Sequence, residues 1–475
     1  GQQLLYGATQ ALLRQVAAGR VTLLCRRDLL EVITVDGVAR GAVARNLLTG
    51  ELEVHTAQAV VLATGGYSNV YFLSTNALKS NASAIWRAHR QGALFANPCF
   101  TQIHPTCIPS GDPGQSKLTL MSESLRNDGR VWVPAAAGDS RDPAQIPEAE
   151  RDYFLERLYP RYANMAPRDL ASRRARELCN SGHGLGPGGR SVYLDLRDAI
   201  AEQGREPIAQ RYGNLLEMYE RITGDDPYAT PLRIYPAPHY TMGGLWVDYQ
   251  LMSSVPGLFV LGEANFSEHG ANRLGASALM QGLADGTFIA PATVTAWLAG
   301  HPTPELAGDH PACREALQRA RARIEALLQA RGQRPVDAFH RELGALIIDR
   351  CGISRTAAGL QAGLAELAAL EQQFRTEVRV PGEATGPNAE LEKGLRVADF
   401  FGLAELMLRD ALAREESCGA HFREEHQSAD GEAMRDDARF AHIAAWEHQG
   451  DGAEPLRHAE PLQFTALQPT ARSYR

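Results

Sequence analysis

The stretch Ala59-Val60-Val61-Leu62-Ala63-Thr64-Gly65-Gly66 decides how this chain is organised. Its unbroken apolar run is typical of a buried central strand, and the Thr-Gly-Gly corner marks the carboxyl end of that strand. Glycines at this end let a backbone approach a cofactor closely, because they carry no side chain. Taken alone, a glycine pair of this kind can equally be a plain turn.

A second strand farther along the chain repeats the pattern. Residues 257–261 are apolar and are followed at once by Gly262 and Glu263. Two strand ends of one kind predict a single sheet interrupted by an inserted domain, whose helical stretches and Pro/Gly loops favour a mixed α+β cap. Upstream, turns at Asp36-Gly37 and Thr49-Gly50 predict a β-meander over residues 21–66 that leads into the first strand.

The rest of the chain predicts mostly helices. Apolar residues recur at three- and four-residue spacing in four segments, which favours an antiparallel helical bundle. These segments are 315–331, 336–349, 355–374 and 391–415. Residues 1–18 predict an amphipathic helix with no initiator Met or signal-peptide pattern, so we expect the chain to begin inside a fold, with its N-terminal part missing.

Composition argues against several functional classes. The formal net charge of -8 provides no overall positive field for nucleic acid. The seven cysteines are scattered and odd in number, which favours reduced thiols over a disulfide framework. No CxxC or HExxH occurs, so no metal site is expected. The longest apolar runs fall far short of the roughly 18 residues of a membrane-spanning helix, so we expect any membrane association to come through a partner.

One motif is misleading. Gly184-Leu185-Gly186-Pro187-Gly188-Gly189 satisfies GxGxxG, the dinucleotide-binding fingerprint. That fingerprint needs a strand before it and a helix after it, so that the pyrophosphate meets a helix N-terminus. Here a helix-like stretch precedes and a strand-like stretch follows, which predicts a surface loop.

Four further clusters carry polar groups suited to chemistry. They are Gln102-Ile103-His104-Pro105-Thr106, Met121-Ser122-Glu123-Ser124-Leu125-Arg126, Ala166-Pro167-Arg168-Asp169, and His239-Tyr240-Thr241-Met242-Gly243-Gly244 with Arg273 downstream. Each has a plain structural explanation when taken singly. His104 can be a turn residue, Ser122 a helix N-cap, and Arg273 a solvated surface group, while Glu123 and Arg168 can form a structural ion pair.

Together the clusters resemble the succinate dehydrogenase and fumarate reductase flavoprotein family in order and spacing. The resemblance begins at Ala63-Thr64-Gly65-Gly66 and includes all four clusters, Gly262-Glu263, Asn272-Arg273-Leu274-Gly275, Gly419-Ala420-His421-Phe422 and Arg472-Ser473-Tyr474. It implies an α/β fold, α+β overall: a Rossmann-like FAD-binding domain lacking its N-terminal part, an inserted α+β capping domain and a C-terminal antiparallel helical bundle. The segments are then 1–101 and 238–300 for the FAD-binding domain, 102–237 for the cap, 301–435 for the helical domain and 436–475 for a C-terminal tail domain.

The resemblance also implies roles at a dicarboxylate site. His239 and Arg273 bind one carboxylate, and His104 with Ser122 binds the other. Arg168 transfers the proton through a relay of Glu123 and Arg126. Residue chemistry alone favours Glu123 or a histidine as the proton carrier, because a free guanidinium has a pKa above about 12.

By the same resemblance the cofactor is FAD. The expected contacts are with Ala63, Thr64, Gly65, Gly66, Gly262, Glu263, Ala278 and Leu279. Glu263 is expected to accept hydrogen bonds from sugar or ribityl hydroxyls of FAD. A helix opening near Ala278 and Leu279 is expected to point its N-terminal amides at the flavin.

The implied partners are succinate or fumarate, an iron-sulfur subunit and a membrane-anchor subunit on the cytoplasmic face of the inner membrane. Two alternatives stay open. L-aspartate oxidase shares the dicarboxylate site and the fold. The chain as given can also be a flavin-free, non-catalytic fragment that binds an iron-sulfur subunit, because its only GxGxxG is misplaced; we expect the isolated chain to lack flavin.

Overall fold

The computed structural model describes residues 1–78, 82–109, 115 and 117–470. The first sheet is an antiparallel meander of β1 (Arg27–Val35), β2 (Val38–Asn46) and β3 (Leu52–Thr56), in the order β1-β2-β3. Asp36 and Gly37 form its first turn at φ 50° and 78°, a backbone that glycine and aspartate accept more readily than branched residues. This meander confirms the sequence prediction, although its first strand starts at Arg27 rather than near residue 21.

The two glycine-ended strands are neighbours. β4 (Val60–Leu62) pairs in parallel with β12 (Leu258–Val260), and Val60 lies opposite Leu258. A backbone hydrogen bond of 2.9 Å from Leu261 N to Leu62 O extends the pairing. The parallel register therefore brings the Thr64-Gly65-Gly66 and Gly262-Glu263 corners to the same edge, as their shared pattern predicts.

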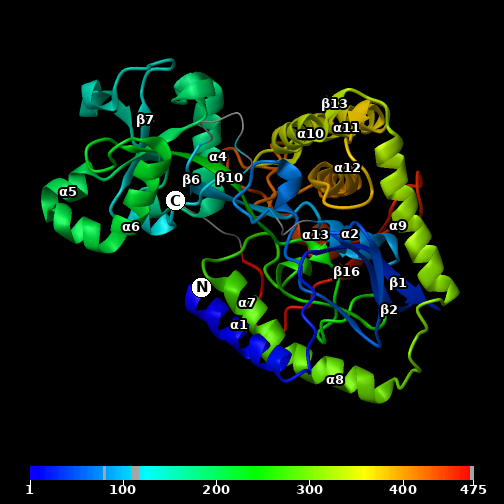
Figure 1. The fold of residues 1–475 in the computed structure, drawn as a ribbon. Helices are drawn as coiled ribbons and strands as arrows, with labels where there is room; N and C mark the ends of the chain where they lie inside the picture. Colours follow the sequence, from blue (N-terminus) through cyan, green and yellow to red (C-terminus); the bar gives the residue numbers. More distant parts are fainter. Residues whose placement is uncertain (79–81, 110–114, 116, 471–475) are drawn as a thin grey trace.

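The segment between these strands forms a separate lobe around a five-stranded sheet (Figure 1). Its strands run in the order β6-β10-β9-β7-β8 and are β6 (Thr101–Cys107), β7 (Arg130–Pro134), β8 (Arg151–Asp152), β9 (Val192–Asp195) and β10 (Leu232–Thr241). Its helices are α3 (Phe154–Leu158), α4 (Arg168–Leu178), α5 (Arg197–Gln203) and α6 (Arg205–Thr223). The lobe has its own apolar core, which includes Phe154, Leu170 and Leu216. The GxGxxG stretch lies between α4 and β9, as predicted.

Helices dominate the later part of the chain and pack around α12 (Ala389–Ala413). Its neighbours are α9 (Pro311–Gln329), α10 (Val336–Cys351), α11 (Ala357–Glu377) and α2 (Ser83–Arg90). A Cβ at Gly402 would lie 2.3 Å from the Trp86 ring, so this glycine allows α12 and α2 to approach closely. The short strands β13 (Arg334–Pro335) and β14 (Val378–Arg379) pair in parallel beside these helices.

A four-stranded sheet joins the C-terminal region to the body of the molecule. Its strands, in the order β11-β5-β15-β16, are β5 (Phe95–Ala96), β11 (Gly244–Leu245), β15 (His442–Glu447) and β16 (Leu456–Pro461); α13 (Asp437–Phe440) precedes β15. Arg472-Ser473-Tyr474, part of the resemblance, lies outside the described residues. The five-segment domain division itself stays a prediction.

Three helices run along one edge of the molecule (Figure 1). They are α1 (Gln2–Ala17), α7 (Ser277–Ala284) and α8 (Ala290–Gly300), and neither α1 nor α8 buries a residue. The apolar face that predicted an amphipathic α1 is therefore exposed, and so are Val21 and Leu23. These residues form no strand because no described strand lies beside them. None of the helices in the described part of the chain is long and apolar enough to cross a membrane.

Candidate active site

Two antiparallel strands bring the predicted histidines together. Ala237 on β10 pairs with His104 on β6, and the rings of His104 and His239 lie edge to face with their centres 5.1 Å apart. His104 is almost fully buried. The two strands belong to segments far apart in sequence, so this contact depends on the sheet and not on local structure.

Glu123 joins the two predicted relay arginines. Its Oε2 accepts a hydrogen bond from Nε of Arg168 at 2.5 Å and forms an ion pair with Nη2 of Arg168 at 2.5 Å. Its Oε1 accepts a hydrogen bond from Nη2 of Arg126 at 2.6 Å. Glu123 and Arg126 lie in a 3₁₀ turn (Glu123–Asn127), and Arg168 is the first residue of α4. These contacts form an unbroken Arg168–Glu123–Arg126 chain, with charge-assisted hydrogen bonds at both links.

Gln102 is a site residue that sequence reasoning did not assign. Its Oε1 accepts hydrogen bonds from Nη1 of Arg168 and Nε of Arg273, both at 3.1 Å, and its Nε2 donates to the Arg273 carbonyl at 2.6 Å. One neutral amide thus orients two guanidiniums. The available signal was its position two residues before His104, which places both side chains on one face of the strand.

Two further contacts hold the site. Thr75 Oγ1 lies 2.8 Å from Nδ1 of His239, a contact that no sequence pattern indicated. The hydroxyl of Ser122 accepts a hydrogen bond from Ser124 N and lies 2.7 Å from Ser124 Oγ. Ser122 is therefore an N-cap in this structure, and its role in binding stays a prediction.

The electrostatics favour an anionic ligand. Burial lowers the pKa of His239 to about 4, with further lowering by Arg273 and Arg168. Burial and Arg168 also lower the pKa of His104 well below its usual value. Both imidazoles are therefore neutral near pH 7. Three guanidiniums, those of Arg126, Arg168 and Arg273, are balanced by two nearby carboxylates, those of Glu123 and Glu263. The site therefore keeps an excess of positive charge for an anionic ligand.

The predicted cofactor residues gather at the edge where β4 and β12 end. Gly65 has φ 76°, and a Cβ at Gly66 would lie 2.1 Å from Thr241 Oγ1 and 2.5 Å from Glu263 Oε1. Glu263 Oε1 accepts a hydrogen bond from Thr241 N at 2.9 Å. The corner is therefore built for glycine, as a close backbone approach requires.

Helix α7 starts beside this chemistry. Its N-cap, Ala276, has φ 63° and provides no side-chain hydrogen bond to the first turn, which contains Ala278 and Leu279. The amides of that turn are suited to an anionic ligand atom. A Cβ at Gly275 would lie 3.8 Å from Nη2 of Arg168. The helix start and the relay are thus adjacent, an arrangement that fits a flavin ring beside a dicarboxylate.

The comparison with known proteins agrees with this geometry. A family model described as "FAD binding domain" matches residues 5–279, and one described as "Fumarate reductase flavoprotein C-term" matches residues 340–474. The chain belongs to the succinate dehydrogenase and fumarate reductase flavoprotein family. The resemblance seen in the sequence is thereby confirmed, and with it the α/β flavoprotein fold and FAD as the family's cofactor.

Individual members of this flavoprotein family match nearly the whole chain. The chain is similar to the succinate dehydrogenase flavoprotein subunit of Bacillus subtilis (strain 168), at 32% identity over 100% of the chain and 76% of the relative. It is also similar to a solved "Quinol-Fumarate Reductase with Menaquinol Molecules", with a TM-score of 0.79 and 27% identity over 94% of the chain and 73% of that structure. L-aspartate oxidase 2 of Ralstonia nicotianae is 29% identical over 84% of the chain and 64% of the relative.

Proposed function

We propose that this chain interconverts succinate and fumarate as the flavoprotein subunit of a succinate:quinone oxidoreductase. The observation that carries this proposal is the Arg168–Glu123–Arg126 chain next to two neutral histidines and Arg273. Such a site provides groups that bind two carboxylates. The Arg168–Glu123–Arg126 chain provides a path for a proton away from the substrate. A monocarboxylate substrate would leave part of the positive charge unpaired.

Substrate binding follows from the charge pattern. His239 and Arg273 hold one carboxylate, while His104 and Ser122 hold the other, so that the central carbon–carbon bond is fixed in one orientation. Neutral imidazoles can donate one hydrogen bond each without adding charge. Arg273 lies with its guanidinium carbon 4.6 Å from the centre of the Tyr240 ring, which limits its movement.

When bound, FAD accepts or returns the hydride at one carbon of the substrate. The residues that would hold it are those of the β4 and β12 ends, with the first turn of α7 facing the flavin. They are Ala63, Thr64, Gly65, Gly66, Gly262, Glu263, Ala278 and Leu279.

The proton at the adjacent carbon moves through Arg168. During succinate oxidation this guanidinium receives the proton from the substrate carbon as it passes one of its own to the carboxylate of Glu123. Glu123 passes a proton to Arg126 only as the cationic Arg126 guanidinium releases one of its own at the far end of the relay. Burial raises the pKa of Glu123, but the hydrogen bonds and charges of Arg168 and Arg126 outweigh it, so the pKa lies below its usual value. Burial lowers the pKa of Arg126. The lowered pKa of Arg126 narrows the difference between the pKa values of Arg126 and Glu123, whereas the lowered pKa of Glu123 widens it. Glu123 therefore does not hold the proton for long, and proton passage to Arg126 is concerted with that at Arg168.

We also propose the partners of this subunit from the family relationship. They are an iron-sulfur subunit, which takes electrons from FAD, and a membrane-anchor subunit that holds this chain peripherally at the cytoplasmic face of the inner membrane. The similarity to a quinol-fumarate reductase supports this assembly.

The test is to assay the full-length protein in its complex with succinate and with L-aspartate, using an artificial electron acceptor. We expect succinate-dependent reduction and no reduction with aspartate. Turnover of aspartate alone would favour the oxidase. A flavin-free complex without dicarboxylate oxidation would favour the non-catalytic alternative.

A further inference from the structure

The far end of the proton relay is held by backbone carbonyls. Arg126 is 3% exposed, and its Nη1 donates to Asn164 O at 2.7 Å and to Ala166 O at 2.8 Å, while its Nη2 donates to Glu123. Water has little access to a group buried this deeply. The position of Arg126 therefore depends on where these two carbonyls lie.

Both carbonyls belong to a short segment that also carries the proton-transferring arginine. Asn164 lies in a 3₁₀ turn (Ala163–Met165), Ala166 follows it, and Arg168 begins α4 two residues later. A shift of this segment would therefore move Arg168 and release Arg126 at the same time. Whatever anchors the segment controls both ends of the relay.

Backbone hydrogen bonds to Tyr159 hold the start of this segment, and the side chain of Asn164 anchors it to other elements of the cap. Its Oδ1 accepts a hydrogen bond from Val131 N on β7 at 2.9 Å, and its Nδ2 donates to Glu156 Oε1 on α3 at 2.8 Å. The side-chain amide thus ties the segment to a strand and a helix of the cap, while its own carbonyl faces Arg126.

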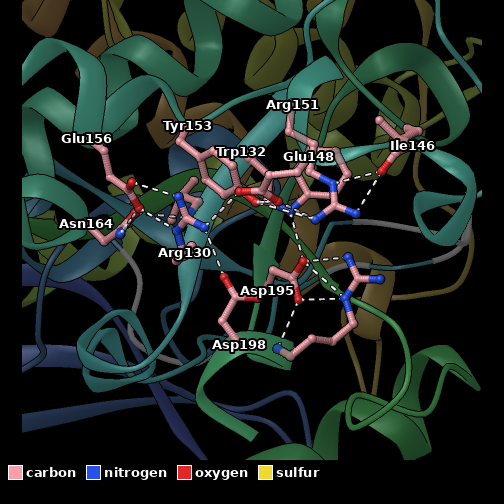
Figure 2. Close-up of polar contacts among 12 residues, drawn as sticks. Arg130, Trp132, Ile146, Glu148, Arg151, Tyr153, Glu156, Asn164, Asp195 and Asp198 are labelled. Atoms are coloured by element: carbon pink, nitrogen blue, oxygen red, sulfur yellow. Dashed lines mark hydrogen bonds and ion pairs between the residues drawn. The ribbon is translucent and has the colours of Figure 1, made fainter. Parts of the chain in front are cut away.

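Glu156 is in turn fixed by an ionic cluster. Its two oxygens accept hydrogen bonds from Nε and Nη2 of Arg130, each at 2.9 Å (Figure 2). Arg130 also bonds to Glu148 at 3.1 Å and to Asp198 at 3.0 Å, and its guanidinium carbon lies 3.5 Å from the centre of the Tyr153 ring. A bidentate ion pair within such a network holds its members more firmly than a single surface pair.

We propose that Asn164 is a positioning residue for the proton relay, because it fixes the carbonyl that holds Arg126 against Glu123. This inference rests on the proposed function, since the relay matters only if a proton crosses it. Asn164 does not touch the substrate; it acts through Arg126.

The contact has an electrostatic consequence at Glu123. The groups facing this carboxylate are Arg126 from its own turn, Arg168 from α4, His104 from β6 at 3.8 Å, His239 from β10 and Arg273 from the loop before α7. Losing the Arg126 contact removes one of its two hydrogen-bonded cations. The pKa of Glu123 then rises.

The experiment compares Asn164→Ala with the wild type in the flavin-loaded complex. We expect kcat for succinate to fall about tenfold, with KM and the Kd for malonate nearly unchanged, because the relay and not the binding site is altered. We expect the acid limb of the pH profile to move up by about one pH unit. Amide hydrogen exchange over residues 122–127 should also become faster, independently of turnover.

Two companion variants keep the test decisive. Glu156→Ala frees only the Nδ2 end of Asn164, so it should shift the acid limb in the same direction by a smaller amount, even if Asn164→Ala does not fold. Arg157→Ala is the matched control on α3: it breaks an ion pair with Asp152, at 2.7 Å, that has no link to Asn164. We expect wild-type kcat, pH profile and exchange from it.

The possible failures are distinct. The positioning role is overturned if both Asn164→Ala and Glu156→Ala keep an unshifted acid limb and full kcat per flavin. It is also overturned if malonate binding and turnover are lost in parallel, because that indicates general damage to the site. A wild-type complex that binds malonate but does not oxidise succinate contradicts the proposed function itself, and the relay role falls with it.

Discussion

Arg168 and Glu123 are joined by a hydrogen bond and an ion pair at one oxygen: Nε of the guanidinium donates to Glu123 Oε2 at 2.5 Å, and Nη2 lies 2.5 Å from the same oxygen. The remaining nitrogen, Nη1, is held by Gln102 at 3.1 Å. Arg168 is therefore oriented by a carboxylate on one side and an amide on the other. These contacts fix the orientation of the Arg168 guanidinium, so the site depends on that orientation as well as on its charge.

Replacing Gln102 tests that orientation. Gln102→Met keeps the volume of the side chain but removes its hydrogen bonds to Arg168 and Arg273. Hydrogen bonds to charged groups contribute about 1.5–3 kcal/mol each, so we expect kcat/KM for succinate to fall about tenfold to a hundredfold. Steady-state kinetics provides the measurement. Gln203→Met, at an exposed site in the cap, is the control, and equal effects of the two changes would contradict the role of Gln102.

Arg168→Ala separates chemistry from binding. The variant lacks the group that exchanges a proton with the substrate, so we expect kcat to fall by about a thousandfold while the Kd for malonate changes little. Arg174→Ala on the same helix, which breaks a 2.6 Å ion pair with Glu177, should leave both quantities near wild type. Weak malonate binding with normal turnover of bound succinate would assign Arg168 to binding instead.

Sequence reasoning predicted several elements of the fold for identifiable physical reasons, whereas the roles of the site residues came from family resemblance and stay predictions. The pairing of β4 with β12 followed from the glycines at two buried strand ends, and the helices α9 to α12 followed from apolar spacing. The catalytic assignment of Arg168 came from family resemblance, because side-chain chemistry alone favoured Glu123 or a histidine.

The contacts that were missed all depend on long-range placement. The two-residue spacing of Gln102 and His104 places them on one face of β6, but the sequence could not show that Arg168 and Arg273 meet at the Gln102 amide. Nothing local marks Asn164, whose anchors lie on β7 and α3. Helix α1 shows a second limit of the sequence. Its apolar spacing predicts a helix but does not show whether another part of the protein covers the apolar face, which is exposed here.

Arg273→Ala should weaken substrate binding. Arg273 is 6% exposed, so a carboxylate that loses this partner stays partly buried and unpaired. Such losses cost about 2–5 kcal/mol, and we expect the Kd for malonate to rise by a hundredfold or so, measured by calorimetry. Arg273→Lys keeps the charge but not the contact to Gln102, so it should restore part of the affinity. An unchanged Kd in Arg273→Ala would contradict the assignment.

Gly66→Ala tests the cofactor corner. The added Cβ would meet Thr241 Oγ1 and Glu263 Oε1 inside contact distance, and forcing an extra carbon into a packed site costs about 1–3 kcal/mol. We expect the affinity for FAD to fall about tenfold to a hundredfold, measured by flavin content after dialysis. Gly286→Ala, where a Cβ meets nothing within 4 Å, is the control. Full flavin retention in Gly66→Ala would show that this corner does not approach the cofactor.

Buried histidines make the stability of the fold depend on pH. Burial lowers the pKa of His89 from 6.5 to about 4, and the residue is 1% exposed. Between these two pKa values the unfolded chain binds a proton that the folded chain does not, so the free energy of unfolding rises with pH across this window and falls as pH drops from 6.5 toward 4. One such histidine contributes a slope of about 1.4 kcal/mol per pH unit.

His89→Gln removes the titrating group, so the free energy of unfolding should depend less steeply on pH. Urea unfolding at several pH values from 4 to 8 provides the measurement. At pH 8, His89 is neutral in both the folded and the unfolded chain, so any difference in the free energy of unfolding there does not come from protonation. That difference reflects the lost contact of His89 with Ala93 O at 2.8 Å. Starting from that difference at pH 8, the free energies of unfolding of the variant and the wild type should converge as pH falls, because only the wild type loses the stability that depends on neutral His89. Parallel curves from pH 8 to pH 4 would show that His89 takes up its proton without unfolding the chain.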